Sequence, residues 1–327
     1  MELEKEADAE DIDAYTGLAE VYMRIGEYEK ALKEIDKAIE MVKGAQNKDY
    51  SNIYKIKFKI LTRANRSEEC LSFMKEAAAY GNFKDYLPCM LYAYDSMNLS
   101  SESRAIVDEL YKNNKKDQNI AYEKMICCLL NNDVRKAKSV INKSRIYYTD
   151  NETWAYWNML VQDFVGEYKD VLKYYMDIVE TWTAKHKSRE TDLSLQYGNI
   201  AQNLYFLGRM DEARTYAEKT IEDCDRELGK YILDEPLYLT RKARACMILG
   251  DEKQARELIE EARRMPLCRM CEHNFCKDAL HFEALIEEMA GNYEKALELC
   301  KTGEKECPGE TDFISVQNRI KGKMKKK

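Results

Sequence analysis

The sequence predicts an all-α protein, and three observations carry that prediction. The chain of 327 residues contains only 13 glycines and four prolines, which leaves little room for glycine-rich loops or β-hairpins. Small and bulky apolar residues recur eight times in one order, at the spacing of amphipathic helices. Within each recurrence lies a turn marked by glycine or asparagine, residues that tolerate a left-handed backbone at the end of a helix. Each recurrence therefore indicates two helices joined by a short turn.

The eight turns set the register of the helix pairs. They are marked by Gly26, Asn65, Asn98, Asn132, Gly166, Gly208, Gly250 and Gly291. Successive marks are 33 to 42 residues apart, and the longest intervals lie in the C-terminal half. The pattern thus predicts eight helix pairs of unequal length.

The first pair, Tyr15 to Lys43, shows the pattern most clearly. Its positions are Tyr15, Leu18, Ala19, Tyr22, Gly26, Tyr28, Ala31, Ile35 and Ala38. This order resembles the tetratricopeptide repeat, a two-helix unit of about 34 residues. The resemblance implies a right-handed α-solenoid of about eight such pairs, in which the concave surface usually binds a partner.

The later pairs repeat these positions with substitutions. The second has Tyr54, Phe58, Leu61, Cys70, Met74 and Ala77; the fourth has Ala121, Met125, Cys128, Ala137 and Ile141; the seventh has Leu239, Ala243, Cys246, Ala255, Ile259 and Ala262; the eighth has Leu280, Ala284, Tyr293, Ala296, Cys300 and the terminal Pro308. In the third and fifth, Ser103 and Val171 replace the usual alanine of the second helix. We expect the cysteines at these positions to be core residues.

The sixth pair begins at Tyr197 and has a long second helix that continues through Thr220 to about Gly229. Its 42-residue spacing resembles the kinesin-light-chain type of tetratricopeptide repeat. Bacterial peptide-sensing regulators use similar long repeats, and the resemblance to the repeat family covers roughly residues 11–308.

We expect four segments along the chain: an acidic tail (1–10), the repeats (11–308), a capping helix (309–320) and a basic tail (321–327). Thr311 is suited to begin the capping helix with a side-chain cap. Phe313, Val316 and Ile320 form one apolar stripe, so the opposite face should be polar and solvated, as the end of a solenoid requires.

The resemblance also predicts where a ligand binds, because first helices line the groove in this family. The positions that project into it are Lys55, Lys59, Arg63, Tyr92, Tyr122, Tyr156, Asn199, Gln202, Tyr205, Arg241 and Arg244. Cations at both ends, with amide and phenol groups between them, suit an extended acidic peptide or a free carboxylate. The alternative is that these are solvated helix residues. Tyr156 stands where the carboxylate-clamp members have lysine, so a chaperone-tail clamp is not expected.

A cysteine cluster lies between the seventh and eighth pairs. Cys268, Cys271 and Cys276 include a Cys-x-x-Cys pair with zinc-ligand spacing, and His273, His281 or Cys307 would have to supply a fourth ligand. A structural zinc would join the last two pairs. The alternatives are a redox-sensing thiol pair and plain reduced thiols, and no other cofactor is expected.

Charge and motifs exclude several other functions. The net charge of −7 argues against general nucleic-acid binding, although residues 319–327 hold five lysines and one arginine. The N-terminus lacks the apolar segment of a signal peptide, no run of residues is long enough to span a membrane, and eleven scattered cysteines suit a reducing cytoplasm. Nucleotide-binding, serine-hydrolase and zinc-protease motifs are absent, so no enzyme activity is expected.

The sequence therefore predicts a cytoplasmic, non-enzymatic scaffold that captures an extended, acidic segment of a protein or peptide partner in its concave groove. One alternative is a regulatory receptor for a small signalling peptide. Such receptors often carry a DNA-binding domain before the repeats, and because the first repeat begins by about residue 11, we do not expect one here. The other alternative is a zinc- or redox-responsive protein that uses Cys268, Cys271 and Cys276. The sequence does not predict the oligomeric state.

Overall fold

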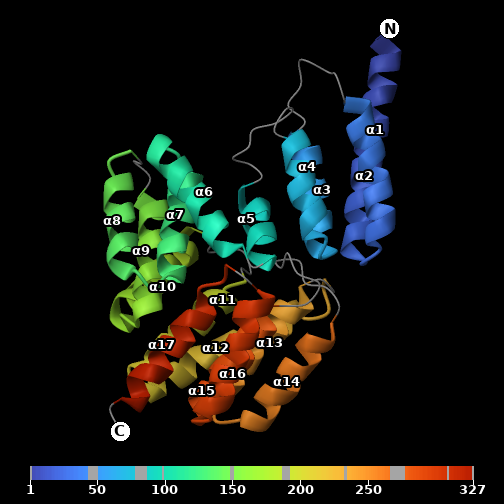
Figure 1. The fold of residues 1–327 in the computed structure, drawn as a ribbon. Helices are drawn as coiled ribbons and strands as arrows, with labels where there is room; N and C mark the ends of the chain where they lie inside the picture. Colours follow the sequence, from blue (N-terminus) through green and yellow to red (C-terminus); the bar gives the residue numbers. More distant parts are fainter. Residues whose placement is uncertain are drawn as a thin grey trace. The chain divides into compact units, whose positions relative to one another are not determined.

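The computed structural model describes residues 2–42, 51–77, 87–97, 99–147, 151–185, 192–231, 234–265, 277–307 and 309–325. Within these ranges the chain forms seventeen α-helices and no β-strand, so the predicted all-α class is confirmed (Figure 1). None of these helices combines the length and apolar composition that crossing a membrane requires.

The helices follow one another with short connections. They are α1 (Glu2–Arg24), α2 (Tyr28–Val42), α3 (Ser51–Arg63), α4 (Ser67–Ala77), α5 (Leu87–Ser96), α6 (Ser100–Asn113), α7 (Gln118–Leu130), α8 (Val134–Ser144), α9 (Asn151–Val165), α10 (Tyr168–Lys185), α11 (Ser194–Phe206), α12 (Met210–Glu227), α13 (Glu235–Leu249), α14 (Glu252–Arg264), α15 (Lys277–Ala290), α16 (Tyr293–Glu306) and α17 (Asp312–Met324).

The packing divides the chain into two units. Unit 1 contains α1 to α5 and the first half of α6, and unit 2 begins at Asp108 and contains α7 to α17. The sequence predicted one continuous array over 11–308, whereas the contacts group the helices into these two bodies.

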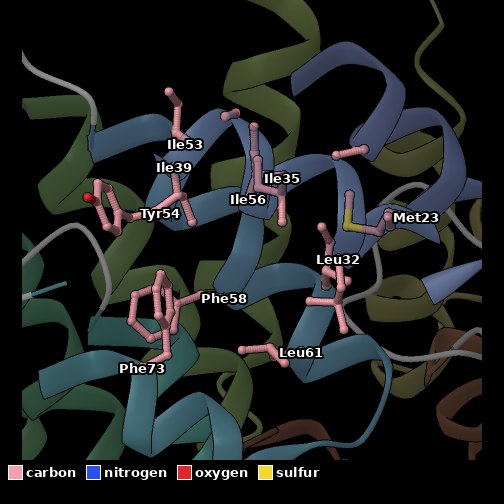
Figure 2. Close-up of a cluster of buried hydrophobic side chains, with 14 of the residues drawn as sticks. Met23, Leu32, Ile35, Ile39, Ile53, Tyr54, Ile56, Phe58, Leu61 and Phe73 are labelled. Carbon is pink, nitrogen blue, oxygen red and sulfur yellow. The ribbon is translucent and has the colours of Figure 1, made fainter. Parts of the chain in front are cut away.

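In unit 1, α1 pairs with α2 and α3 pairs with α4, and α3 also contacts α1, α2 and α5. Figure 2 shows the resulting core, in which side chains of α1 to α4 meet. Phe58 and Phe73 lie with their ring centroids 5.1 Å apart, and Tyr54 stacks on Phe73 at 5.8 Å. Each fully buried apolar side chain in such a core stabilises the fold by about 1.5–3 kcal/mol.

In unit 2, five helix pairs stack in chain order. The second helix of each pair contacts the first helix of the next, as α8 contacts α9, α10 contacts α11, α12 contacts α13 and α14 contacts α15. The first helices also touch one another, α7 with α9, α11 with α13 and α13 with α15. We call α7, α9, α11, α13 and α15 the first-helix layer.

The turns between paired helices have the predicted backbone. Positive φ angles occur at Gly26, Asn65, Asn132, Gly166, Gly208, Gly250 and Gly291, while Asn98 lies outside the described residues. After two of these turns an aspartate caps the next helix, because Asp133 accepts a hydrogen bond from the Lys136 amide and Asp251 from the Gln254 amide, each at 3.0 Å. The turn residue and the cap together stop one helix and start the next.

Most of the predicted core positions are buried, although Leu18 is 45% exposed. Ala31, Ala121 and Ala243 are fully buried, and so are Ser103 and Val171 of the two irregular pairs. Cys70, Cys128, Cys246 and Cys300 are buried, and desolvation raises the pKa of each thiol. These cysteines act as small apolar core residues.

The two ends of the chain differ from the prediction. Residues 2–10, expected as a tail, are the start of α1, and α17 continues to Met324, beyond the expected end at residue 320. Phe313, Val316 and Ile320 are buried as predicted, but Thr311 makes no side-chain cap. The expectation of a solvated opposite face is wrong, because α17 also contacts α9 and Ile314 packs into the core between α7 and α9.

Candidate functional site

The α3 stripe, Lys55, Lys59 and Arg63, is the predicted cationic end of the groove. Lys55 is exposed and Lys59 is half-buried, but only 8% of Arg63 is exposed. Arg63 lies close enough to Tyr28 that its charge opposes the desolvation that raises the pKa of this phenol. The stripe therefore offers its charge to solvent mainly at its first two positions.

The whole of α3 is cationic. Its sequence, Ser51 to Arg63, contains four basic residues and no acidic residue. Lys57 is neutralised by Asp36 at 2.7 Å and lies 4.2 Å from the centroid of the Phe73 ring. The remaining positive charge belongs to the α3 stripe. Tyr92 on α5 was predicted to follow, and its side chain lies outside the described residues.

Tyr122 and Tyr156 come together in unit 2. Their hydroxyl groups share a hydrogen bond, and the Tyr122 ring is 5.9 Å from that of Trp157. Desolvation raises the pKa of both phenols. The ion pair of Lys277 with Glu310, at 2.5 Å, acts electrostatically on Tyr122. This contact brings the start of the first-helix layer close to the segment that precedes α17.

Asn199, Gln202 and Arg244 also come together, but they bind one another. The Arg244 Nη1 donates to Asn199 Oδ1 at 2.7 Å and to Gln202 Oε1 at 3.0 Å. Only 2% of Arg244 is exposed, and burial lowers the pKa of its guanidinium to about 10. The prediction that Arg244 is a solvent-exposed groove residue is wrong, because the side chain is buried and its Nη1 joins α11 to α13.

Two neighbours explain how an arginine fits there. A Cβ at position 198 would lie 2.3 Å from Arg244 Nη2, so the helix has room for the guanidinium only because this residue is glycine. On the other side, the guanidinium carbon is 4.8 Å from the centroid of the Phe282 ring. Arg244 thus connects three successive members of the first-helix layer.

Arg241 and Tyr205 occupy separate environments. Arg241 Nη1 donates to Ser194 Oγ at 2.9 Å, and it lies 3.5 Å from Asp192 Oδ2. Tyr205 is half-buried against the core formed by α11 and α12, with its ring edge-on to Phe206 at 5.7 Å. Of the predicted groove residues whose side chains the structure describes, Arg63, Gln202 and Arg244 are buried.

The residues by which α17 binds the first-helix layer were not among the predicted site residues. Glu288 on α15 is fully buried and accepts hydrogen bonds from Arg319 Nη2 and Lys323 Nζ, each at 2.9 Å. Both cations also lie over the Phe206 ring of α11, at 5.1 and 5.4 Å. Arg319 and Lys323 are four residues apart, so they lie on one face of the helix. This spacing was the sequence feature that could have indicated a shared acidic partner.

A second carboxylate in this layer is also perturbed. Desolvation raises the pKa of Asp163 on α9 to about 6. Arg319 and Arg244 oppose this shift through their charges, and Asp312 reinforces it. His281 on α15 is desolvated as well, which lowers the pKa of its imidazole, and its ring is 6.0 Å from that of Phe313. The first-helix layer beneath α17 therefore contains titratable groups whose charged forms are disfavoured by desolvation.

A pocket of about 490 Å³ lies beside the C-terminal half of α17. Its walls are the turns at Asn132 and Gly166, the aromatic rings of Phe164 and Tyr168, and the α17 side chains Asn318, Arg319 and Lys323. Asn318 Nδ2 of α17 donates a hydrogen bond to Asn132 Oδ1, in the turn between α7 and α8, at 3.1 Å.

The predicted metal ligands Cys268, Cys271, His273 and Cys276 lie outside the described residues. His281 is half-buried against aromatic rings, and Cys307 is buried in the core of α15 to α17. Across the described ranges, no group of three or more His, Cys, Asp and Glu side chains is placed to hold a metal ion. The structural zinc stays a prediction.

Two helix pairs match models of a known protein family. Residues 12–41, which include the α1–α2 turn, and residues 195–234, which include α11 and α12, match models of the tetratricopeptide repeat. Both segments are thus similar to the tetratricopeptide repeat. A search of curated proteins gave no match.

A search of solved structures found similar chains, among them a tetratricopeptide repeat protein. One from Parabacteroides merdae is 12% identical with a TM-score of 0.38, and the match covers 95% of this chain and 99% of that one. The Cut9–Hcn1 assembly is 10% identical with a TM-score of 0.45 over 90% of this chain and 52% of that one. The complex of yeast Sti1 TPR2AB with pHSP90 is 13% identical with a TM-score of 0.28 over 90% and 98%. Likenesses at this level give no residue-by-residue correspondence.

Proposed function

We propose that this protein is a non-enzymatic scaffold that binds other proteins through its tetratricopeptide repeats. Two segments match the repeat, and the helix pairs of unit 2 stack so that their first helices lie next to one another. Stacked repeats of this kind present extended surfaces suited to binding. The 18-residue second helices α10 and α12 support the kinesin-light-chain type of repeat for the C-terminal half.

The partner segment in this proposal is extended and acidic, and it binds along the α3 stripe. The observation that carries this is the composition of α3, which has four cations and no acid. Lys57 has its own counter-ion in Asp36, and Lys55 is exposed, so Lys55 presents charge that an acidic segment would neutralise. Complementary charge steers such partners and selects among them.

The proposal places the protein in the cytoplasm, with no nucleic-acid or membrane partner. It assigns no cofactor and no catalytic residue.

The test is an affinity capture from the lysate of the source organism, read by mass spectrometry. The baits are the wild-type chain, a Lys55→Glu/Lys59→Glu variant, and a matched Lys143→Glu variant at an exposed position of α8. We expect a partner that the wild type and Lys143→Glu retain and the double variant loses. Equal retention by all three baits would contradict binding along the α3 stripe.

Arg244 is left unchanged in these baits. Its removal would leave the buried oxygens of Asn199 and Gln202 without their donor, so a loss of binding could come from a loss of folding.

A further inference from the structure

The helix α17 contacts unit 2 at both of its ends. It packs against α15 and α16 of the last helix pair, and it also contacts α9. Asn318 binds Asn132, a residue 186 positions earlier in the chain, in the turn of the first pair. A capping helix needs only the last pair, so these additional contacts call for an explanation.

Two sides of α17 are apolar. Phe313, Val316 and Ile320 are fully buried in the core with α15 and α16, and Phe313 fits against Gly303, where a Cβ would lie 2.2 Å from its ring. Ile314 lies on another side of the helix and packs into the core formed by α7, α8 and α9. The helix is therefore held between the last pair and the first two pairs of unit 2.

The polar contacts of α17 are specific for positive charge. Glu288 is buried, and it accepts from two cations of α17 one helical turn apart, Arg319 and Lys323. The Phe206 ring lies beneath both cations. A buried carboxylate next to an aromatic face selects a basic side chain and disfavours an acidic one.

The two halves of α17 are held differently. The N-terminal half is fixed by the apolar contacts of Phe313 and Ile314. The C-terminal half borders the 490 Å³ pocket, and there the polar contacts of Asn318, Arg319 and Lys323 add to the buried Ile320. We expect a competing helix to displace this half of α17 first.

We propose that the first-helix layer of unit 2, beneath α17, is a docking surface for a basic amphipathic helix, and that α17 is its resident occupant. A partner helix with the same pattern, two apolar sides followed by two cations four residues apart, replaces α17. This surface is distinct from the α3 stripe, and it selects a basic partner where the stripe selects an acidic one. The proposal made here and the proposed function are therefore tested independently.

The test uses the full chain with a protease site inserted between Pro308 and Gly309, cut after folding. The probe is a fluorescent synthetic peptide of residues 309–327, followed by fluorescence anisotropy. We expect saturable binding to the cut chain and at least about tenfold weaker binding to the uncut chain, because the tethered helix competes at a millimolar effective concentration.

Matched variants test the charge selection. An Arg319→Glu/Lys323→Glu peptide, and Glu288→Gln in the cut chain, should each weaken binding at least about tenfold. Glu298→Gln, at an exposed position of α16, should leave binding unchanged.

Three results would overturn the proposal. One is a cut chain that keeps its circular dichroism spectrum but does not bind the peptide. Another is a chain that loses its helical signal on cutting, which would make α17 a fixed part of the fold. The last is equal affinity for the wild-type and charge-reversed peptides.

Discussion

Unit 1 and unit 2 are built from the same helix-pair pattern, yet they use their first helices differently. In unit 1, α3 keeps Lys55 in solvent and carries only basic charges. In unit 2, the first-helix layer buries Glu288 and binds the cations of the chain's own last helix. The repeat pattern determines which residues enter the core. It does not determine the charge of the first helices on their other face, or whether another helix covers that face.

The largest expected effect is the loss of the α17 anchor. Phe313→Ala should destabilise unit 2 by about 3–5 kcal/mol, because it empties a fully buried site against Gly303. Hydrogen exchange should show loss of protection throughout unit 2, from α7 to α17, with little change in α3. Phe58→Ala, equally buried in unit 1, is the matched control and should give the reverse pattern. Loss of protection in both units from either variant would contradict their separation.

A smaller effect is expected from the buried ion pair. Arg319→Ala should destabilise unit 2 by about 3 kcal/mol, because Glu288 would remain buried with Lys323 as its counter-ion. Urea denaturation measures this change. Lys323→Ala is the control and should cost less, because the Lys323 side chain is 39% exposed and that of Arg319 is 9% exposed. Equal costs would show that the two cations share Glu288 evenly.

The third prediction is a pH dependence that Asp163 gives to unit 2. The pKa of Asp163 is raised from its ordinary value of 3.8 to about 6, so the folded state holds a proton that the unfolded state releases. This contribution to stability is therefore lost as pH rises from about 4 to about 6. Asp163→Asn should abolish this pH dependence, because asparagine does not ionise. It should stabilise unit 2 at pH 8, where the wild-type carboxylate is ionised and desolvated, by on the order of 1–3 kcal/mol.

The readout is thermal unfolding at pH 4 and pH 8. Glu298→Gln, at an exposed position of α16, is the control and should show the wild-type pH profile. A stabilisation by Asp163→Asn that is the same at both pH values would contradict the assignment.

The smallest effect is expected on the α3 stripe. Lys55→Glu changes an exposed side chain, so the free energy of unfolding should change by less than about 0.5 kcal/mol. Chemical denaturation monitored by circular dichroism checks this. A larger loss would mean that Lys55 has a structural role, and the contrast between an open face in unit 1 and a covered face in unit 2 would weaken.

Local chemistry made much of the fold predictable. Gly26, Asn65 and Gly250 have the left-handed backbone that their residue types favour, and the small residues that follow them by a few positions are buried. These features depend on a few neighbouring residues, so a single sequence reveals them.

The binding surfaces were harder to predict, because they depend on residues far apart in the sequence. Arg244 has the helical position of a groove residue, and only the combination of Gly198, Asn199 and Phe282 makes it a buried one. The contact of Asn318 with Asn132 spans 186 residues and leaves no periodic signal. Helix periodicity indicates which side of a helix is apolar, but not which distant helix covers it.

The contact of α17 with both ends of unit 2 has a consequence for folding. In an open array of repeats each pair is stabilised only by its neighbours, so the end pairs fray first and unfolding spreads along the array. Unit 2 has no such free end, because the last helix holds the first pair through Ile314 and Asn318. Its five helix pairs should therefore unfold together, in one cooperative step.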